Sequence, residues 1–421
     1  MINKTKILYF MADPITRRDA GNRTHVLQML EYFNSRHEYV ELDYVGVKEW
    51  GDWNNTDYEE FNRLFPHCNL HTIKLRMPKD NIFRYYFKSK LPNQLRKKRA
   101  KRNGNAVIDD YTTVHLHQNF NELLQKKKYD CIIMSYVTWS TLLENNPNVE
   151  GVKLIIDTHD FMTAQFKGRA GFQLGKTFER EMKLLSIYNE TWSQSADEQY
   201  LFSQFLPVKH RFVPIMYKDN SLGASLVESQ EYDLIYVGSE NDNNQQSINW
   251  FFNTVYPLLP KDIRICVIGK ICDYFPSFPN VEKHLFVYDL SEYYHKAKLA
   301  ICPMLNGTGV KVKVVEAMSY GLPIVCNLRG LDGLPIKDGN GCLRADSPEE
   351  FAHGIQSLLT DDKYRSKISE KAKETFNTFF EINKCYKDLD KVFNISLRKE
   401  NRVRTLSTFE NGVERRALEA L

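Results

Sequence analysis

Short runs of consecutive apolar residues alternate with longer amphipathic stretches along most of the chain. Residues 6–12 (KILYFMA) form one such run, and residues 24–36 (THVLQMLEYFNSR) repeat apolar positions at helical spacing. Three further apolar runs predict more strands: 129–136, 152–160 and 190–195. Continuous apolar strands separated by helices are typical of parallel sheets covered on both faces. The pattern predicts a doubly wound, Rossmann-like α/β domain over residues 1–212.

The same pattern restarts in the second half and predicts a second domain of this kind over residues 231–380. Its expected strands are residues 232–239, 263–270, 299–305 and 323–327, with a helix at 246–259. Residues 213–230 are expected to link the domains, because they become polar and aperiodic from about Lys218. Helical periodicity over 364–393 predicts a long helical segment, with 381–398 returning toward the first domain and 399–421 as a tail.

Composition narrows the class of protein. A chain of 421 residues exceeds one ordinary core, and a net charge of +4 gives no argument for nucleic acid as a partner. The eight cysteines are scattered without a CxxC pair, which suits a reducing cytoplasm and predicts no zinc site. The N-terminal apolar run is too short for a signal peptide or a membrane span. We expect a cytoplasmic protein, at most peripheral at the inner face of a membrane.

Residues 306–325 (NGTGVKVKVVEAMSYGLPIV) carry the strongest candidate site. Open parallel sheets bind ligands at the carboxyl ends of their strands, and this stretch follows such a strand. Its glycines allow close approach of a ligand, and a helix expected from near Gly309 would direct its N–H groups at an anion. Lys313 and Glu316 share a helix face, whereas Lys311 is expected to be solvated. A phosphate cradle beside a ribose acceptor describes a nucleotide; the alternative is an ordinary surface Lys–Glu pair.

The stretch from Pro303 to Val325 also resembles the nucleotide-sugar motif of retaining glycosyltransferases of family 4 (group 1), within the GT-B fold. The chain matches the family pattern Pro-x-x-x-Gly-x-Gly-x-x-x-Lys-x-x-Glu-Ala-Met-x-x-Gly-x-Pro-Val over some twenty positions, with Ile324 at the final Val. The resemblance continues over residues 232–252, 263–269 and 287–305, and in the first half over 154–160 (LIIDTHD). It implies two Rossmann-like domains that face each other across a cleft.

By resemblance, Glu316 accepts the ribose hydroxyls and Lys313 holds the diphosphate. The other implied donor-binding residues are Gly307, Thr308 and Gly309 at the loop, Gly238, Ser239 and Gly269 on the opposite turns, and Val287, Tyr288 and Asp289 beside the base. The chain departs from the family twice. Thr308 stands where many members carry a glutamate that contacts the donor sugar, and 240–246 (ENDNNQQ) replaces their Arg and Lys pair.

The first domain contributes candidates on its own strand-to-helix loops. Gly21 and Asn22, and with them Arg23, are expected near the donor diphosphate and acceptor; the alternative is that Asn22 or Thr24 only caps the helix. His159 follows a strand and is predicted to contact the donor sugar or transfer a proton. Asp157 and Asp160 either orient His159, bind acceptor hydroxyls or cap the next helix.

Two further segments need separate interpretation. Residues 170–177 (AGFQLGKT) fit a relaxed P-loop pattern, but no buried strand precedes them, so we reject that reading. Residues 84–102 hold nine basic residues, interleaved aromatics and no acid. This composition suits an anionic membrane surface, with a solvated, partly disordered loop as the alternative. No recognised nucleic-acid-binding module accompanies it.

The sequence predicts a retaining glycosyltransferase that moves a sugar from a nucleoside-diphosphate sugar to a hydroxyl of a glycan, lipid-linked or protein acceptor, in bacterial surface glycan assembly. No Asp-x-Asp or histidine cluster is present, so neither metal nor cofactor is expected. Two alternatives stay open: a nucleotide-sugar 2-epimerase of the same architecture, and a non-catalytic nucleotide-binding subunit.

Overall fold

In a computed structural model, residues 4–17, 21–221 and 230–395 are described and form two parallel sheets. The N-terminal sheet has seven strands in the order β3-β2-β1-β4-β5-β6-β7. Its strands are β1 (Thr5–Phe10), β2 (Val40–Val47), β3 (Cys68–Ile73), β4 (Cys131–Ser135), β5 (Lys153–Asp157), β6 (Glu190–Ser193) and β7 (Lys209–Phe212). The carboxyl ends of the strands share one edge because every pairing is parallel.

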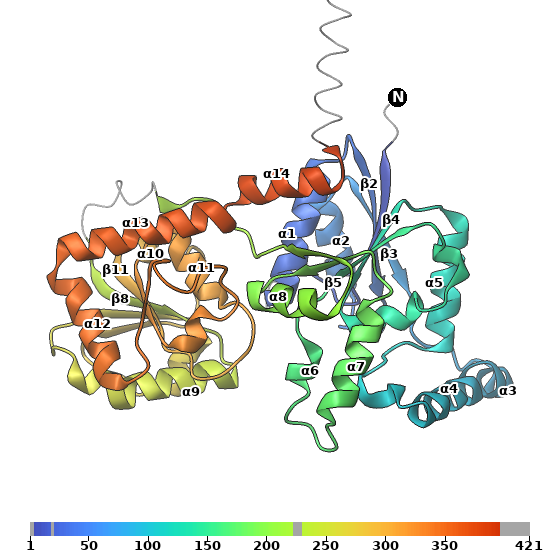
Figure 1. The fold of residues 1–421 in the computed structure, drawn as a ribbon, viewed down its shortest axis with the longest axis horizontal. Helices are drawn as coiled ribbons and strands as arrows, with labels where there is room; N and C mark the ends of the chain where they lie inside the picture. The colour runs from blue at the N-terminus through green and yellow to red at the C-terminus, as the bar shows by residue number, and fades with distance from the viewer. Residues whose placement is uncertain (1–3, 18–20, 222–229, 396–421) are drawn as a thin grey trace, which may run out of the picture.

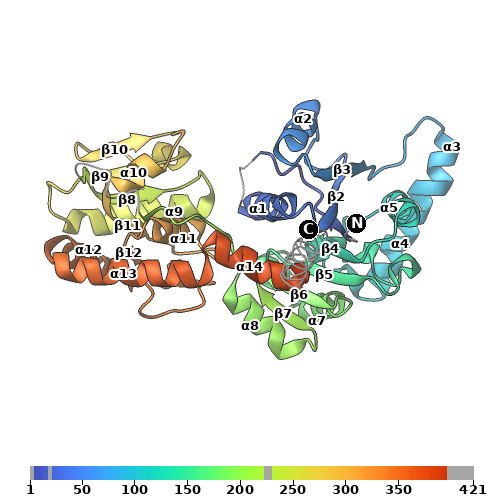
Figure 2. The ribbon, with the colours of Figure 1, turned by 90° about the horizontal axis from the view of Figure 1, so that it is seen from above.

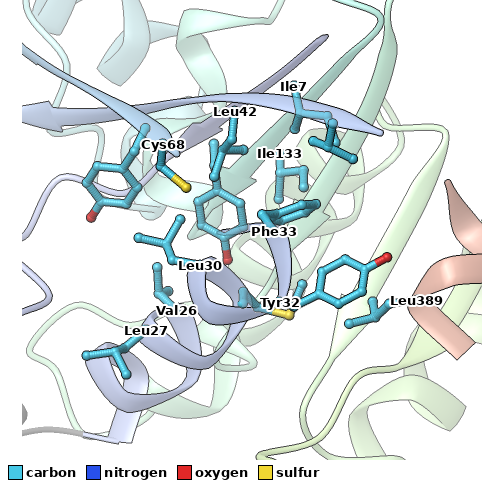
Figure 3. Packing of buried hydrophobic residues seen from close by; sticks show 14 of the residues in the cluster. Ile7, Val26, Leu27, Leu30, Tyr32, Phe33, Leu42, Cys68, Ile133 and Leu389 are labelled. Atoms are coloured by element: carbon cyan, nitrogen blue, oxygen red, sulfur yellow. The ribbon is translucent and has the colours of Figure 1, made fainter. Parts of the chain in front are cut away.

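Helices cover both faces of this sheet because β1 is apolar on both sides. Ile7 and Tyr9 pack with α1 (Gly21–Ser35), α2 (Asn55–Leu64) and α14 (Ile382–Val392), as Figure 3 shows for part of this cluster. Leu8 and Phe10 belong to the opposite cluster. That cluster receives α5 (Val114–Lys126), α7 (Leu174–Leu185) and α8 (Ala196–Phe205). The remaining helices are α3 (Ile82–Tyr85), α4 (Leu91–Arg102) and α6 (Met162–Gln165).

The C-terminal sheet has six strands in the order β10-β9-β8-β11-β12-β13. They are β8 (Tyr232–Val237), β9 (Ile265–Ile268), β10 (Val281–His284), β11 (Ala297–Cys302), β12 (Ile324–Cys326) and β13 (Cys342–Arg344). One face packs against α11 (Val312–Ser319) and α13 (Asp362–Phe379), and the other against α9 (Asp242–Trp250) and α12 (Pro348–Thr360). The short α10 (Ser291–His295) precedes β11.

The predicted α/β class is confirmed, and each expected apolar run contains a strand. Short or alternating strands such as β2, β7 and β13 were not predicted, since they are not continuous apolar runs. The segment predicted to be helical over 364–393 is divided into α13 and α14. The chain leaves helical geometry at Phe380 (φ −122°), and Glu381 caps α14 by accepting from the backbone N–H of Lys384.

The chain crosses between the domains twice, and Figures 1 and 2 show the second crossing as α14 running from the C-terminal domain onto the N-terminal one. At this crossing the Tyr32 hydroxyl and the Arg36 guanidinium both donate to Asp390. At the first crossing the Gln28 side chain makes two hydrogen bonds with the backbone of Met216, at 2.5 and 2.9 Å. The expected tail, residues 399–421, lies outside the described residues. None of the described helices is both long and apolar enough to cross a bilayer.

Replacing Gln28 by alanine tests how firmly the first crossing is held. The change leaves the buried N–H and C=O of Met216 without partners, and we expect a loss of about 2 kcal/mol or more of stability. The melting temperature, followed by scanning fluorimetry, should fall by several degrees, roughly 2–4 °C per kcal/mol. Gln118→Ala on the exposed side of α5 is the control and should have little effect. Equal melting temperatures for the two variants would contradict this account.

Candidate functional site

A cavity of 130 Å³ lies between the two domains, where loops from both sheets meet. It brings together six residues predicted from the sequence: Gly21, Asn22, His159, Asp160, Thr308 and Gly309. Five others that line it were not predicted: Gln194, Ser195, Ile215, Val310 and Val312. The remaining predicted residues lie on the surrounding loops and helices of each domain. Arg23 does not line this cavity and forms an ion pair with Asp13, at 3.0 Å.

Lys311 fixes the glycine loop after β11, residues 307–309, through the loop's carbonyl groups. Its ammonium group donates to the carbonyls of Gly307, Thr308 and Gly309, and its side chain is only 6% exposed. The expectation that Lys311 is solvated is therefore wrong. Gly307 and Gly309 have φ of 97° and 70°, which only glycine adopts without strain. The helix starts later than expected, at Val312 rather than near Gly309.

Lys313 is partly buried, and its hydrogen-bond partners are neutral. Its Nζ donates to Oδ1 of Asn244 at 2.8 Å and to the Tyr236 hydroxyl at 3.0 Å, and it lies 4.2 Å from the centre of the Tyr236 ring. Within the described ranges no carboxylate forms an ion pair with it. Burial lowers the pKa of Lys313 to about 8. The charge is therefore present at neutral pH without an anionic partner.

Asn244 connects Lys313 to the turn after β8. It stands in the first turn of α9, within the segment that replaces the family's Arg and Lys pair, and its Nδ2 donates to the carbonyl of Ser239 at 3.0 Å. Gly269 (φ 111°) packs beside this turn, where a Cβ would lie 2.1 Å from the carbonyl oxygen of Gly238. Gly238, Ser239 and Gly269 thus form two touching turns at one edge of the sheet.

Glu316 lies one turn beyond Lys313 on α11, and the Tyr294 hydroxyl donates to its Oε2 at 3.1 Å. Burial raises the pKa of Glu316 to about 6, so the carboxylate is charged at neutral pH. Val287, Tyr288 and Asp289 lie on the loop before α10 and are more open. The Tyr288 side chain is fully exposed, and Asp289 accepts from the backbone N–H of Ser291.

In the N-terminal domain the buried carboxylate of Asp157 organises the site. The Tyr9 hydroxyl donates to its Oδ2 at 2.7 Å, and Nε2 atoms of His25 and His159 lie 3.2 and 3.5 Å from the same oxygen. Burial opposes ionisation of Asp157, but the two histidines and the Tyr9 hydroxyl outweigh it and lower its pKa to about 2. Of its predicted roles, the structure supports orientation of His159. Capping and acceptor binding are excluded because the side chain is wholly buried.

His159 is held in a strained conformation above this carboxylate. Its φ is 58°, and Tyr136 at the end of β4 has φ of 64°; their rings stack with centres 4.5 Å apart. Such backbone strain in non-glycine residues is concentrated at functional sites. The Gln194 amide donates to Nδ1 at 2.9 Å, and burial lowers the pKa of His159 to about 4. His159 is therefore neutral at physiological pH and contributes hydrogen bonds, not charge.

The two domains touch through Gln165, whose amide donates to Asp160 at 3.0 Å and to the Thr308 hydroxyl at 2.9 Å. Asp160 does not cap α6, since its N-cap residue is Phe161. Asn22 and Thr24 lie inside α1, which begins at Gly21, so the capping alternative for them is wrong. Residues 170–177 do not follow a strand directly, in agreement with rejection of a P-loop.

Several residues of the candidate site could not be identified from the sequence. Tyr9, His25, Tyr136, Gln194, Tyr236, Asn244 and Tyr294 reach the site only through folding. Of these residues, only Asn244 could have been suspected from the sequence, because it lies in the segment where the chain departs from the family pattern. No group of three or more metal-ligating side chains occurs among the residues described.

Comparison with known proteins finds a family match for part of the chain. Residues 231–361 match the family model of glycosyl transferases group 1. An uncharacterized 44.6 kDa protein in the cps region of Klebsiella pneumoniae is 30% identical over 187 residues, which are 40% of this chain and 46% of that protein. The chain thus spans about half the length of this curated relative.

Two solved structures resemble nearly the whole chain. Sucrose-phosphate synthase from Thermosynechococcus elongatus has a TM-score of 0.63 at 13% identity, over 94% of this chain and 100% of that one. HepE from Anabaena, in complex with UDP and glucose, has a TM-score of 0.61 at 11% identity, over 93% and 99%. At these identities the likeness establishes the fold. Residues 231–361 of this chain are therefore similar to group 1 glycosyl transferases, and nearly the whole chain has the two-domain GT-B fold.

Proposed function

We propose that this protein transfers a sugar from a nucleoside-diphosphate sugar to a hydroxyl acceptor with retention of anomeric configuration. The observation that carries the proposal is the partly buried ammonium of Lys313, which hydrogen-bonds only to the neutral oxygens of Asn244 and Tyr236. A buried charge without a counter-charge is costly, so it marks a site for an anion. A diphosphate leaving group supplies that anion, and a preorganised cation stabilises the charge that develops as the glycosidic bond breaks.

The other donor contacts follow from the loops around Lys313. With its carbonyls tied to Lys311, the loop of Gly307 to Gly309 leaves its N–H groups for phosphate and sugar oxygens. Glu316 accepts from the ribose hydroxyls. The base packs beside residues 287–289, and Gly238 and Gly269 give the diphosphate close access to the backbone.

The N-terminal domain supplies the opposite wall. Asp157 faces Nε2 of neutral His159, and in the proposed complex a donor-sugar hydroxyl replaces the Gln194 amide as the hydrogen-bond donor to Nδ1. The cavity of 130 Å³ is smaller than the roughly 300 Å³ or more of typical ligand sites, so the domains separate to admit donor and close again around it. Closure excludes water, which suppresses hydrolysis of the donor.

The acceptor class and the location are also part of the proposal. HepE was solved with UDP and glucose, which makes a uridine nucleotide and a hexosyl group the first donor to test. The relative from a cps region supports a place in surface polysaccharide assembly. Such acceptors are lipid-linked, so we place the protein in the cytoplasm, peripherally at the inner face of the membrane.

Nucleotide binding is the first test. UDP, GDP, ADP, CMP and dTDP are compared by thermal shift; the cognate nucleotide at 100 times its dissociation constant should add about 2.7 kcal/mol of stability. Glu316→Ala should remove this shift, whereas Glu370→Ala on the exposed side of α13 should keep it. No shift with any nucleotide would overturn the donor site. A shift without turnover of the matching nucleotide sugars would instead support the non-catalytic alternative.

The pH dependence of nucleotide affinity tests the two ionisable groups separately. Lys313 loses its proton as the pH rises through about 8, so the dissociation constant should increase up to about tenfold per pH unit above that value. Lys313→Arg should abolish this alkaline limb, because a guanidinium stays charged. An unchanged limb in that variant would refute the role of Lys313.

The acid limb should lie near pH 6, where Glu316 becomes protonated and can no longer accept two ribose hydroxyls. The second ionisation of a terminal phosphate also lies near pH 6, at roughly the same place. Glu316→Gln separates the two contributions, since only the phosphate then titrates. Isothermal titration calorimetry in buffers of constant ionic strength measures both limbs, and an acid limb identical in the variant would refute the assignment to Glu316.

Metal dependence is the remaining part of the proposal. Because Lys313 and the loop N–H groups neutralise the diphosphate, we expect sugar transfer to continue in EDTA at an unchanged rate. The measurement is product formation with and without the chelator, followed by added Mg²⁺ or Mn²⁺. Complete loss of activity in EDTA with recovery on adding either ion would contradict this expectation.

A further inference from the structure

Residues 82–102 form one continuous helix on the outer side of the N-terminal domain. It consists of α3, the π-helical turn η1 (Tyr86–Lys90) and α4, and the residues at both junctions keep right-handed helical φ and ψ. Figures 1 and 2 show it far from the C-terminal domain. The alternative of a solvated, disordered loop is therefore wrong. The catalytic proposal gives this helix no role.

One face of the helix is fixed to the domain. Ser89 is buried, Asn93 accepts from the backbone N–H of Val114 at 2.9 Å, and the Arg96 guanidinium donates to the Thr141 hydroxyl at 3.0 Å. Arg96 also forms an ion pair with Asp110. These contacts fix the orientation of the helix about its own axis. The side chains on its opposite face therefore point into solvent.

The opposite face is apolar to an unusual degree. Ile82, Phe83 and Phe87 are 77%, 79% and 62% exposed, and Tyr86 and Leu95 are 41% and 57% exposed. The π-turn adds one residue to the helical spacing, which brings Leu95 back toward the side of Phe83 and Phe87. Exposed aromatic and aliphatic side chains gathered on one helix indicate a contact surface.

The charge on the same helix is entirely positive. Nine lysines and arginines occur between Arg84 and Arg102 without any acid. Among them Lys98 and Arg102 are exposed and lie away from the cavity that Lys97 and Lys101 line on the other side. Basic residues that flank exposed apolar ones complement a surface with anionic groups above a hydrocarbon layer.

We propose that this helix docks the protein onto a membrane of anionic lipids, with Ile82, Phe83 and Phe87 entering the acyl boundary and Lys98 and Arg102 at the headgroups. A second copy of the chain fits poorly, because a two-fold contact through this face would bring like charges together. Nucleic acid would use the cations but would leave Ile82 and Leu95 without apolar partners. The inference deepens the proposed membrane location, yet the surface is separate from Lys313 and Glu316.

Vesicle co-sedimentation of the full chain tests the proposal. Binding is expected to phosphatidylcholine vesicles that contain phosphatidylglycerol, to be weaker without it, and to decrease with added salt. Both Lys98→Glu/Arg102→Glu and Phe83→Ser/Phe87→Ser should reduce the partition coefficient by roughly tenfold or more. Matched controls are Lys363→Glu/Lys367→Glu on α13 and Leu174→Ser/Tyr200→Ser, which change exposed side chains elsewhere. Both should bind as the unaltered protein does.

Four other readouts make the test decisive. The melting temperature of each variant shows that it folds, and the nucleotide shift should persist in all of them, so loss of docking and failure of the donor site are separate results. Absence of vesicle binding by the unaltered protein, or equal binding by all variants, would overturn the proposal. So would a dimer that Phe83→Ser/Phe87→Ser dissociates in size-exclusion chromatography, or tight binding of an oligonucleotide that vesicles do not displace.

Discussion

The donor half of the site depends on one partly buried cation. Lys313 is partly withdrawn from water and is hydrogen-bonded to an amide oxygen and a phenol, which satisfy its donors without cancelling its charge. This arrangement lowers the pKa of the ammonium group but keeps the group in place for an anion. Asn244 hydrogen-bonds both to Lys313 and to the carbonyl of Ser239. The position of the ammonium group and the shape of the opposite turn therefore depend on each other.

Lys311 shows that neighbouring lysines with the same side chain have different tasks. The Lys311 ammonium group hydrogen-bonds to the carbonyls of the glycine loop. Its charge is balanced by these carbonyl dipoles and by Asp332 at 3.9 Å. Because the carbonyls of this loop face Lys311, its N–H groups face the opposite side, where an anion can bind. Lys311 therefore shapes the anion-binding loop, and Lys313 supplies the positive charge beside it.

The N-terminal half is built around the opposite charge. Asp157 is completely buried at the end of β5 and holds Tyr9, His25 and His159 around one oxygen. Strain at His159 and Tyr136 persists because the stacked rings and this carboxylate determine their positions. The two halves meet at the hydrogen bond of Gln165 with Thr308 and at those of Asp197 with Gly333 and Lys337, polar contacts that water can replace when the domains separate.

The sequence by itself determined the α/β class, the strand before the glycine loop, and Lys313 and Glu316 as a pair on one helix. These features are local, since apolar runs, glycines and helical spacing act within a few residues. Only the tertiary structure decided that Lys311 is buried, that 364–393 breaks at Phe380, and that Asn244, Tyr236 and Tyr294 surround the pair. Such contacts join residues 69, 77 and 22 positions apart. Their proximity depends on strand order and domain packing, which no local pattern encodes.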